Sequence, residues 1–332
     1  MNVKYMFSFM AVVLLFLVAY AGVEVAGMQV VFGIFIPYLA LALFLGGFIR
    51  RVMGWAASPV PFPIPTTCGQ QASLPWIQQA KLDNPSTKGG VIARMALEIL
   101  LFRSLFRNLK FKYMEGGKFY YGLELFLWLG ALAFHYAFLV VTIRHLRFFT
   151  EPVPFFVKIL ETVDGFFQFG LPIVYLSGIV LLAAALFLCL RRMLTPQVNY
   201  ISLAADYFPL FLIIGIAATG LMMRYFTKVD VVAIKQFSMG LATFQPAIPE
   251  GVGGLFYVHL FFVCVLLANF PFSKLMHLGG VFMCPTRNLP GNTRAERHVN
   301  PWNYPVKVHT YEEYEDDFRE LMIEAGLPVE KE

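Results

Sequence analysis

The sequence predicts an all-α fold, a polytopic membrane helical bundle with six transmembrane helices. Hydrophobic residues make up 58% of the 332 residues and charged residues only 14%, and the mean hydropathy is +0.65. Soluble domains have about 45–50% apolar and about 25% charged residues. Because lipid cannot satisfy unpaired backbone groups, spanning segments are helices or strands of a closed barrel. The apolar runs of this chain are long and continuous, which favours helices.

The N-terminal region predicts two spans. Residues 6–49 are apolar apart from Glu24, with a tight turn near Gly22–Met28, and the second span ends at Arg50-Arg51. The first segment also resembles a cleavable signal peptide, because a basic residue and an apolar stretch precede Ala19-Tyr20-Ala21. We expect the segment to be retained as a span.

Four more apolar runs follow, each with about the twenty residues that the bilayer core requires. They cover residues 120–143, 166–190, 207–223 and 253–277. The spans divide the chain into three parts. These are an extra N-terminal transmembrane helix at 1–27, a core at 28–280 that includes a cytoplasmic loop at 50–119, and a tail at 281–332.

The segments outside the spans differ in character. The loop 52–90 is rich in Pro and polar residues and predicts irregular structure. Residues 91–112 mix Leu, Ile and Phe with Arg and Lys, which indicates an interfacial amphipathic helix or, equally, a helix packed on the spans or a partner. A helix is expected at 311–325, with acidic residues in its first turns. Residues 281–309 are expected to dock a partner subunit, with a flexible solvated tail as the alternative.

The distribution of basic residues predicts the orientation in the membrane. With the N-terminus inside, twenty of the 26 Lys and Arg residues lie on the inner side and six on the outer side. Basic residues accumulate in cytoplasmic loops. We therefore expect a multi-pass protein of the cytoplasmic membrane with both termini in the cytoplasm.

Four of the six histidines lie within two apolar segments, in pairs. His135 and His145 are ten residues apart, and His259 and His277 are eighteen apart. Ionisable side chains at membrane depth are costly and usually functional. Neutral imidazole is also a haem ligand. The pattern predicts two haems, each held by histidine on both faces.

The direction of the two helices predicts which histidines pair. Helix rise separates the first pair by about 15 Å and the second by about 27 Å. Antiparallel helices then place His145 with His259 near the outer side and His135 with His277 deeper, and a kink at Pro271 can reconcile the unequal spacings. The alternatives are hydrogen-bonded core histidines and a zinc site, for which the four are too far apart. The remaining histidines, His298 and His309, are expected at the surface or an interface.

Several basic residues lie on the predicted outer side, although most basic residues lie on the inner side. Arg144, Arg147 and Arg224 are candidates to contact haem propionates, because guanidinium binds carboxylates through paired hydrogen bonds. Anchoring to lipid headgroups is the alternative. Lys158 is a candidate to polarise a quinone carbonyl.

The histidine segments also carry a family resemblance. The stretches HYAFLVVTIRH (135–145) and HLFFVCVLLANFPFSKLMH (259–277), together with IIGIAATGLMMRYF, resemble the respiratory nitrate reductase gamma subunit family over residues 28–280. In the tail, CPTRNLPGN and RHVNPWN (297–303) resemble the DsrM cytochrome b subunits of DsrMKJOP complexes. The extra first span, long inner loop and long tail fit DsrM better than the nitrate reductase pattern.

The resemblance implies a menaquinol-linked cytochrome b with two haem b groups, active in sulfur or sulfate respiration. Its partners would be a cytoplasmic iron–sulfur subunit resembling DsrK, which is like heterodisulfide reductase, and the other DsrMKJOP subunits. The four cysteines form no CxxC pair, which agrees with iron–sulfur clusters residing in a partner. The expected surroundings are membrane lipid and no nucleic acid.

Three other functions are compatible with parts of the pattern. A cytochrome b of a nitrate reductase, hydrogenase or formate dehydrogenase would share the haems but not the partner. A haem-free transporter would use the histidines in a polar pathway, although such folds usually carry internal repeats. A scaffold subunit would anchor a complex without carrying electrons.

Overall fold

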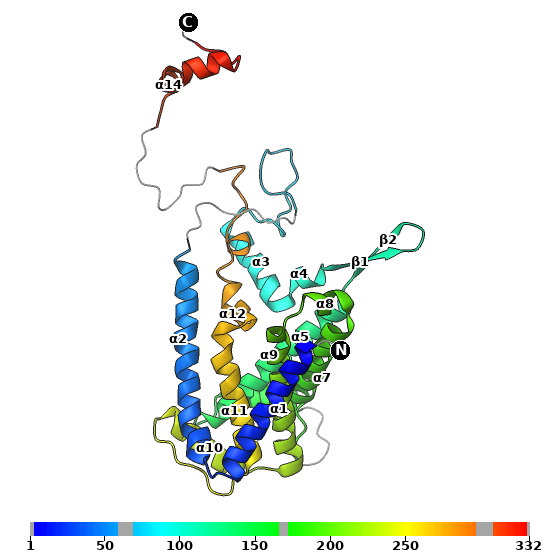
Figure 1. The fold of residues 1–332 in the computed structure, drawn as a ribbon, viewed down its shortest axis with the longest axis vertical. Coiled ribbons are helices and arrows are strands. Elements are labelled where there is room, and N and C mark those ends of the chain that lie inside the picture. The colour runs from blue at the N-terminus through cyan, green and yellow to red at the C-terminus, as the bar shows by residue number, and fades with distance from the viewer. Residues whose placement is uncertain (1–2, 59–68, 166–171, 297–307, 331–332) are drawn as a thin grey trace. The chain divides into compact units, whose positions relative to one another are not determined.

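The computed structural model describes residues 3–58, 69–165, 172–296 and 308–330 (Figure 1). The chain forms two compact units. The first comprises Met1–Ser58 and Ile92–Asn288, and the second comprises Pro59–Val91 and Leu289–Glu332.

Six helical segments of the first unit are long and apolar enough to cross a membrane, which confirms the predicted fold class. They are α1 (Val3–Glu24), η1 with α2 (Val31–Phe35 and Ile36–Ala56), α5 with η2 (Leu125–His145 and Leu146–Phe148), α7 (Leu176–Leu194), α9 with η3 (Ala204–Met222 and Met223–Thr227) and α11 with η4 (Gly254–Asn269 and Phe270–Phe272). Two of these begin later than the hydropathy predicts. Strand residues precede Leu125, and the described residues 172–175 ahead of Leu176 are not helical.

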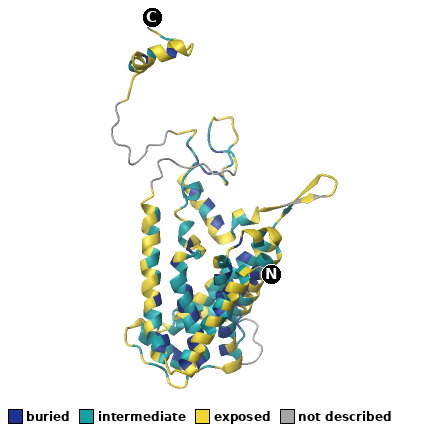
Figure 2. Cartoon of the chain, in the orientation of Figure 1, coloured by how far each residue is buried: buried dark blue, intermediate teal, exposed yellow. Residues whose placement is uncertain are grey.

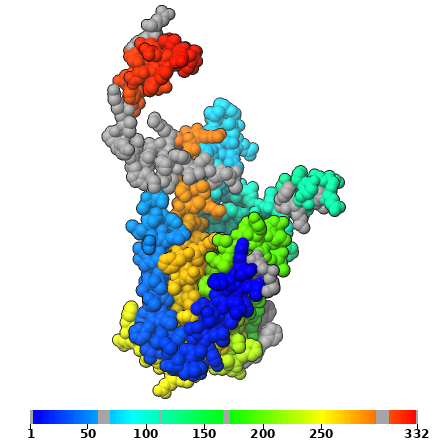
Figure 3. Space-filling view, viewed as in Figure 1, coloured from blue at the N-terminus to red at the C-terminus, as the bar shows by residue number. Residues whose placement is uncertain are grey.

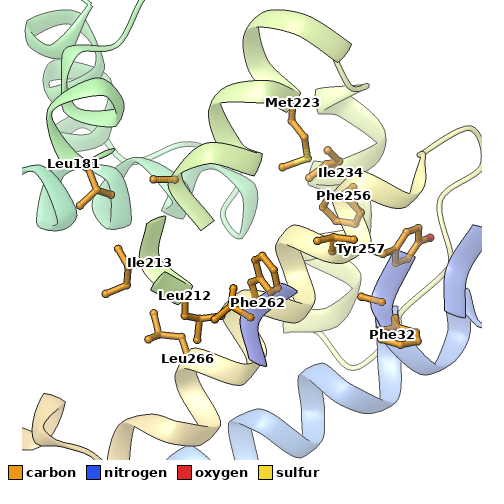
Figure 4. Packing of buried hydrophobic residues seen from close by; sticks show 14 of the residues in the cluster. Phe32, Leu181, Leu212, Ile213, Met223, Ile234, Phe256, Tyr257, Phe262 and Leu266 are labelled. Atoms are coloured by element: carbon orange, nitrogen blue, oxygen red, sulfur yellow. The ribbon is translucent and has the colours of Figure 1, made fainter. Parts of the chain in front are cut away.

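The six spans pack mainly through α9 and α11. Helix α5 contacts α7, α7 contacts α9, α9 contacts α1 and α11, and α11 also contacts α1 and α2. Figure 3 shows α1, α2 and α11 along one face of the bundle. The buried apolar side chains between α9 and α11 include Leu212, Phe262 and Leu266 (Figure 4). Gly215 permits this close packing, because a Cβ there would lie 2.8 Å from the Phe262 ring.

The outward surface of the spans is apolar. Helix α2 carries exposed side chains along much of its length, including Leu39, Leu45 and Ile49 (Figure 2). Exposure of such an apolar surface to water is unfavourable, whereas its contact with lipid is not. The chain is therefore a multi-pass membrane protein.

The bundle has two ends, which are named here after the histidines near them. At the His277 end lie the starts of α1, α5 and α9 and the short elements α8 (Pro196–Ile201), η5 (Lys274–Met276), α12 (His277–Gly280) and α13 (Pro285–Asn288). At the His145 end lie the α1–α2 turn and two amphipathic helices, α6 (Phe155–Asp164) and α10 (Val231–Ala242).

The segment predicted as one amphipathic helix at 91–112 is three elements. Helix α3 (Lys88–Leu101) ends where Phe102 adopts a left-handed conformation (φ 49°), and α4 (Arg103–Phe106) follows. Strands β1 (Leu109–Met114) and β2 (Lys118–Leu123) then pair antiparallel, with Tyr113 opposite Phe119. The helix prediction is wrong for residues 109–112. Apolar and basic residues alternate there with a period of two, which suits a strand, and a Gly-Gly turn then closes the hairpin.

The second unit contains irregular structure before α3 and the tail helix α14. Gln71 Nε2 donates a hydrogen bond to Thr293 Oγ1 at 2.9 Å, and the backbone N–H of Gly291 donates to the carbonyl of Pro85 at 2.7 Å. Helix α14 (Tyr311–Glu324) begins with a reciprocal capping box between Thr310 and Glu313. The helix predicted at 311–325 is confirmed. The motif at 297–303 lies outside the described residues, as does His298.

Candidate functional site: two histidine pairs at opposite ends of the bundle

The first pair joins α5 to the segment that follows α11. The ring centres of His135 and His277 lie 5.9 Å apart, with the ring planes at 84°. Phe102 and Phe134 pack in T-shaped contacts with the His135 ring, with centres at 4.9 and 5.2 Å. The left-handed turn between α3 and α4 therefore covers one side of this pair.

The sequence spacing suggested that His277 belongs to the sixth span, but in the structure it lies beyond that span. Helix α11 ends at Asn269, a 3-10 turn carries Pro271, and Ser273 is extended before the chain turns again at η5. The continuous helix expected over 253–277, with its separation of about 27 Å, is wrong. The break falls at the proline that was expected to kink the helix, because proline lacks the N–H that a helix requires.

The second pair lies at the other end. His145 is the last residue of α5, and His259 lies in the second turn of α11. His259 lies near the start of α11, and His145 at the end of α5, so both belong to the same end of the bundle. Gly220 on α9 lets His259 approach, because a Cβ there would lie 3.2 Å from the imidazole Cε1.

All four imidazoles use the same ring nitrogen for a protein hydrogen bond. The Nδ1 atom of His135 lies 2.8 Å from the carbonyl of Ala131, and that of His145 lies 2.7 Å from the carbonyl of Val141. The Nδ1 atom of His277 lies 2.9 Å from the carbonyl of Lys274. The Nδ1 atom of His259 lies 2.9 Å from Thr219 Oγ1. A carbonyl only accepts, so Nδ1 of the first three carries the proton. The Thr219 hydroxyl donates to the carbonyl of Gly215 at 2.8 Å, and therefore accepts from His259.

This tautomer leaves Nε2 of each ring with a lone pair, and no Nε2 atom bonds to another described residue. His135 and His259 are half-buried, and His145 and His277 are exposed. A fully packed core histidine would have both nitrogens satisfied. The described residues contain no group of three or more His, Cys, Asp or Glu side chains arranged for a metal ion. Two imidazoles per site instead match the axial ligand set of a haem iron.

A cavity of about 280 Å³ opens beside the second pair. Its lining includes His145, Phe148 and the three predicted arginines Arg144, Arg147 and Arg224. Arg224 belongs to η3, a π-helical turn at the end of α9, and such turns often occur at functional sites. Lys158 is exposed on α6 and is not part of the cavity lining.

Buried acceptors and an aromatic ring hold these arginines. Arg144 donates to Asp164 at 2.7 Å, and its guanidinium lies 3.3 Å from the centre of the Tyr175 ring. The guanidinium of Arg224 lies 4.2 Å from the same ring. Asp164 also accepts hydrogen bonds from the backbone and hydroxyl of Ser177. This carboxylate therefore has a buried, fully hydrogen-bonded position.

The positive charge of the three arginines is not balanced by the carboxylates beside them. Arg147 pairs with Glu161 at 2.8 Å. Asp164 and Glu161 thus face three guanidinium groups, and the buried Nε of Arg144 has no acceptor among the described residues. The cavity wall is electropositive, which suits an anionic ligand.

Sequence reasoning missed Thr219, Gly220, Asp164 and Tyr175. Thr219 and Gly220 lie within the quoted stretch IIGIAATGLMMRYF, but a threonine and a glycine in an apolar helix carry no specific signal for a histidine partner. Asp164 lies twenty residues beyond Arg144, in a different helix. Only tertiary packing brings these groups together.

Comparison with known proteins shows the family of the chain. Residues 96–292 match the family model of the nitrate reductase gamma subunit. A protein of Archaeoglobus fulgidus described as an Hdr-like menaquinol oxidoreductase cytochrome b-like subunit is 44% identical over 281 residues, covering 82% of this chain and 84% of the relative. The corresponding protein of Archaeoglobus profundus is 44% identical over 276 residues, covering 81% of each chain. The chain therefore belongs to the nitrate reductase gamma subunit family.

Proposed function

We propose that this protein is a dihaem membrane cytochrome b that passes electrons between menaquinol and an Hdr-like iron–sulfur partner. The observation that carries the proposal is the shared tautomer of four imidazoles, arranged in two pairs at opposite ends of the bundle. The names of the two relatives support the cytochrome and menaquinol parts.

The residues fit two b-type haems. His135 and His277, whose ring centres lie 5.9 Å apart and whose Nε2 lone pairs are unused, would hold one haem. His145 and His259 would hold the other. A bound haem supplies the one-electron redox chemistry that side chains lack.

The arginines at the His145 end would hold haem propionates. Arg144, Arg147 and Arg224 all line the same cavity. Asp164 and Tyr175 keep Arg144 in place for this contact. Desolvated arginine–carboxylate contacts are strong and geometrically specific.

Menaquinol would be oxidised at the His145 end, facing the outside. The excess of basic residues at the other end supports this orientation, with both termini in the cytoplasm and the protein in the cytoplasmic membrane. Lys158 is a candidate quinone contact there, because an exposed ammonium can donate to a carbonyl. Moving electrons inward would be electrogenic, at about 2.3 kcal/mol per charge per 100 mV.

The partner would bind at the His277 end. We propose a cytoplasmic iron–sulfur subunit resembling DsrK, within a complex like DsrMKJOP that serves sulfur or sulfate respiration. The Hdr-like name of the relatives and the resemblance of CPTRNLPGN support this assignment. Residues 281–309 would contribute to the contact.

The test is haem content per chain, with a reduced-minus-oxidised spectrum of purified protein. Two b-type haems that a menaquinol analogue reduces are expected. Replacing His277 with Ala should leave one haem, whereas His309→Ala, a change in the tail, should leave two. Colourless protein, or two haems in the His277 variant, would refute the proposal. Co-purification of a molybdenum subunit instead of an iron–sulfur subunit would refute the partner assignment.

A further inference from the structure

Asp206 connects the start of α9 to the segment that carries His277. One carboxylate oxygen lies 2.6 Å from Lys274 Nζ, and the other accepts the backbone N–H of Leu203 at 3.0 Å. Arg192 Nη1 lies 3.8 Å away on a second side. The Asp206 side chain is only 5% exposed, although the Lys274 side chain is 80% exposed. The Asp206 carboxylate is thus held in a buried position, and the Lys274 ammonium reaches it from the surface.

Lys274 also contacts His277 directly, through its backbone. Its carbonyl accepts the Nδ1–H of His277 at 2.9 Å. The same residue is therefore tied to α9 by its side chain and to the imidazole by its main chain. Any movement of Lys274 changes the position of the hydrogen bond that orients the ring.

Apart from the burial of Met276, which is 2% exposed, this segment has mainly local contacts. It is separated from α11 by the extended Ser273, and η5 is only three residues long. Ser273 Oγ accepts the N–H of Leu275 at 3.2 Å, which is a local bond within the segment. The other three histidines lie in helices of sixteen residues or more, whose backbone hydrogen bonds fix them. His277 lies outside such a helix, so contacts between its short segment and the rest of the bundle fix its position.

We propose that Asp206 is a positioning residue for His277, acting through the ion pair with Lys274. The inference rests on the proposed haem ligation by His135 and His277. The buried carboxylate holds Lys274, and the Lys274 carbonyl then sets the rotation and tautomer of the imidazole. The ligand field at this end of the bundle therefore depends on a residue of a different helix.

Three variants test the proposal in the full-length protein within its native complex. Asp206→Asn keeps the shape but removes the charge. Lys274→Met removes the ammonium from an exposed position and keeps the carbonyl, so it remains informative if the first variant fails to fold. Glu124→Gln is the matched control, because it removes an ion pair with Arg191 (3.0 Å) at the same end without contacting either histidine.

The readouts are haem content, the midpoint potential of each haem and the low-spin electron paramagnetic resonance signal of each haem. Asp206→Asn and Lys274→Met should each keep two haems, and should shift the potential and signal of the His135/His277 haem alone. The double variant should shift them no further than either single variant, because both break one contact. Asp206→Glu should restore most of the wild-type signal.

Three results would overturn the proposal. One is a shift in Asp206→Asn no larger than in Glu124→Gln. Another is an equal shift of both haems, which would indicate a general structural role. The third is additive shifts in the double variant. Haem content of the wild type is measured first: a haem-free wild type overturns the proposed function as well, whereas a two-haem wild type with unshifted variants overturns only the positioning role.

Discussion

Thr219 Oγ1 lies 2.9 Å from Nδ1 of His259, which makes His259 the one histidine of the four whose Nδ1 bond is made by a side chain. The other three use carbonyls within four residues along their own segment. The hydroxyl is itself fixed by its bond to the carbonyl of Gly215. Helix α9 thus sets the tautomer of a histidine in α11, and this single contact can be removed without altering the backbone.

Replacing Thr219 with Val should weaken haem binding at the His145 end. Val has the shape of Thr but cannot accept the Nδ1–H, so the side-chain hydrogen bond that holds the imidazole is lost. Loss of such a bond behind a ligand typically costs about 10–100-fold in metal affinity. Titration of apoprotein with haem would measure the change. Thr142→Val, which removes only a bond to the Phe138 carbonyl, is the control; equal losses in both would contradict the prediction.

Enlarging Gly220 should displace His259. A Cβ would lie 3.2 Å from the imidazole Cε1, and the longer side chain of Leu cannot fit there without moving the ring. We expect Gly220→Leu to lose one of two haems and Gly220→Ala to retain both with an altered spectrum. Gly46→Leu, where a Cβ meets nothing within 4 Å, should retain both haems unchanged. Full haem content in Gly220→Leu would show that the close approach is unimportant.

Removing the Asp164 carboxylate should destabilise the protein more than removing that of Glu161. Arg144 is 14% exposed and would become a buried charge without its acceptor, at a cost of about 3 kcal/mol. Arg147 is 37% exposed, and water can replace Glu161 at a cost below about 1 kcal/mol. Thermal or denaturant unfolding of Asp164→Ala and Glu161→Ala in the same detergent would measure both. Equal destabilisation would contradict the difference in burial.

Helix α3 should contact lipid with its apolar face. Its charged residues Arg94 and Glu98 are buried, and they bond to the carbonyl of Thr286 (3.2 Å) and to Arg287 (3.3 Å), while Ile92 and Leu100 are 70% and 54% exposed. The face that a soluble helix buries is turned outward, as expected of an interfacial helix.

The lipid contact can be tested by photo-crosslinking. A photoreactive amino acid at position 92 should label phospholipid in native membranes, whereas one at Glu98, buried on the same helix, should not. Labelling of another subunit at position 92 would instead favour the alternative in which this helix packs against a partner.

Hydropathy predicted the six spans because lipid burial depends on composition over twenty residues, and local patterning also predicted α14. The helix prediction failed at β1, although residues 109–112 alternate with the period of two that strands use. Local patterning itself failed after Pro271, where proline predicts a kink but not whether the helix resumes. There the choice depends on contacts with other segments.

By itself, the sequence determined that this chain is a helical membrane protein with four histidines on two of its apolar segments. Composition and spacing along one chain suffice for that. The tertiary structure decided which groups surround each imidazole: Thr219 beside His259, Asp164 beside Arg144, and Lys274 with Asp206 beside His277. These contacts join helices that are far apart in sequence, and packing between helices, rather than any local pattern, brings their side chains within hydrogen-bonding distance.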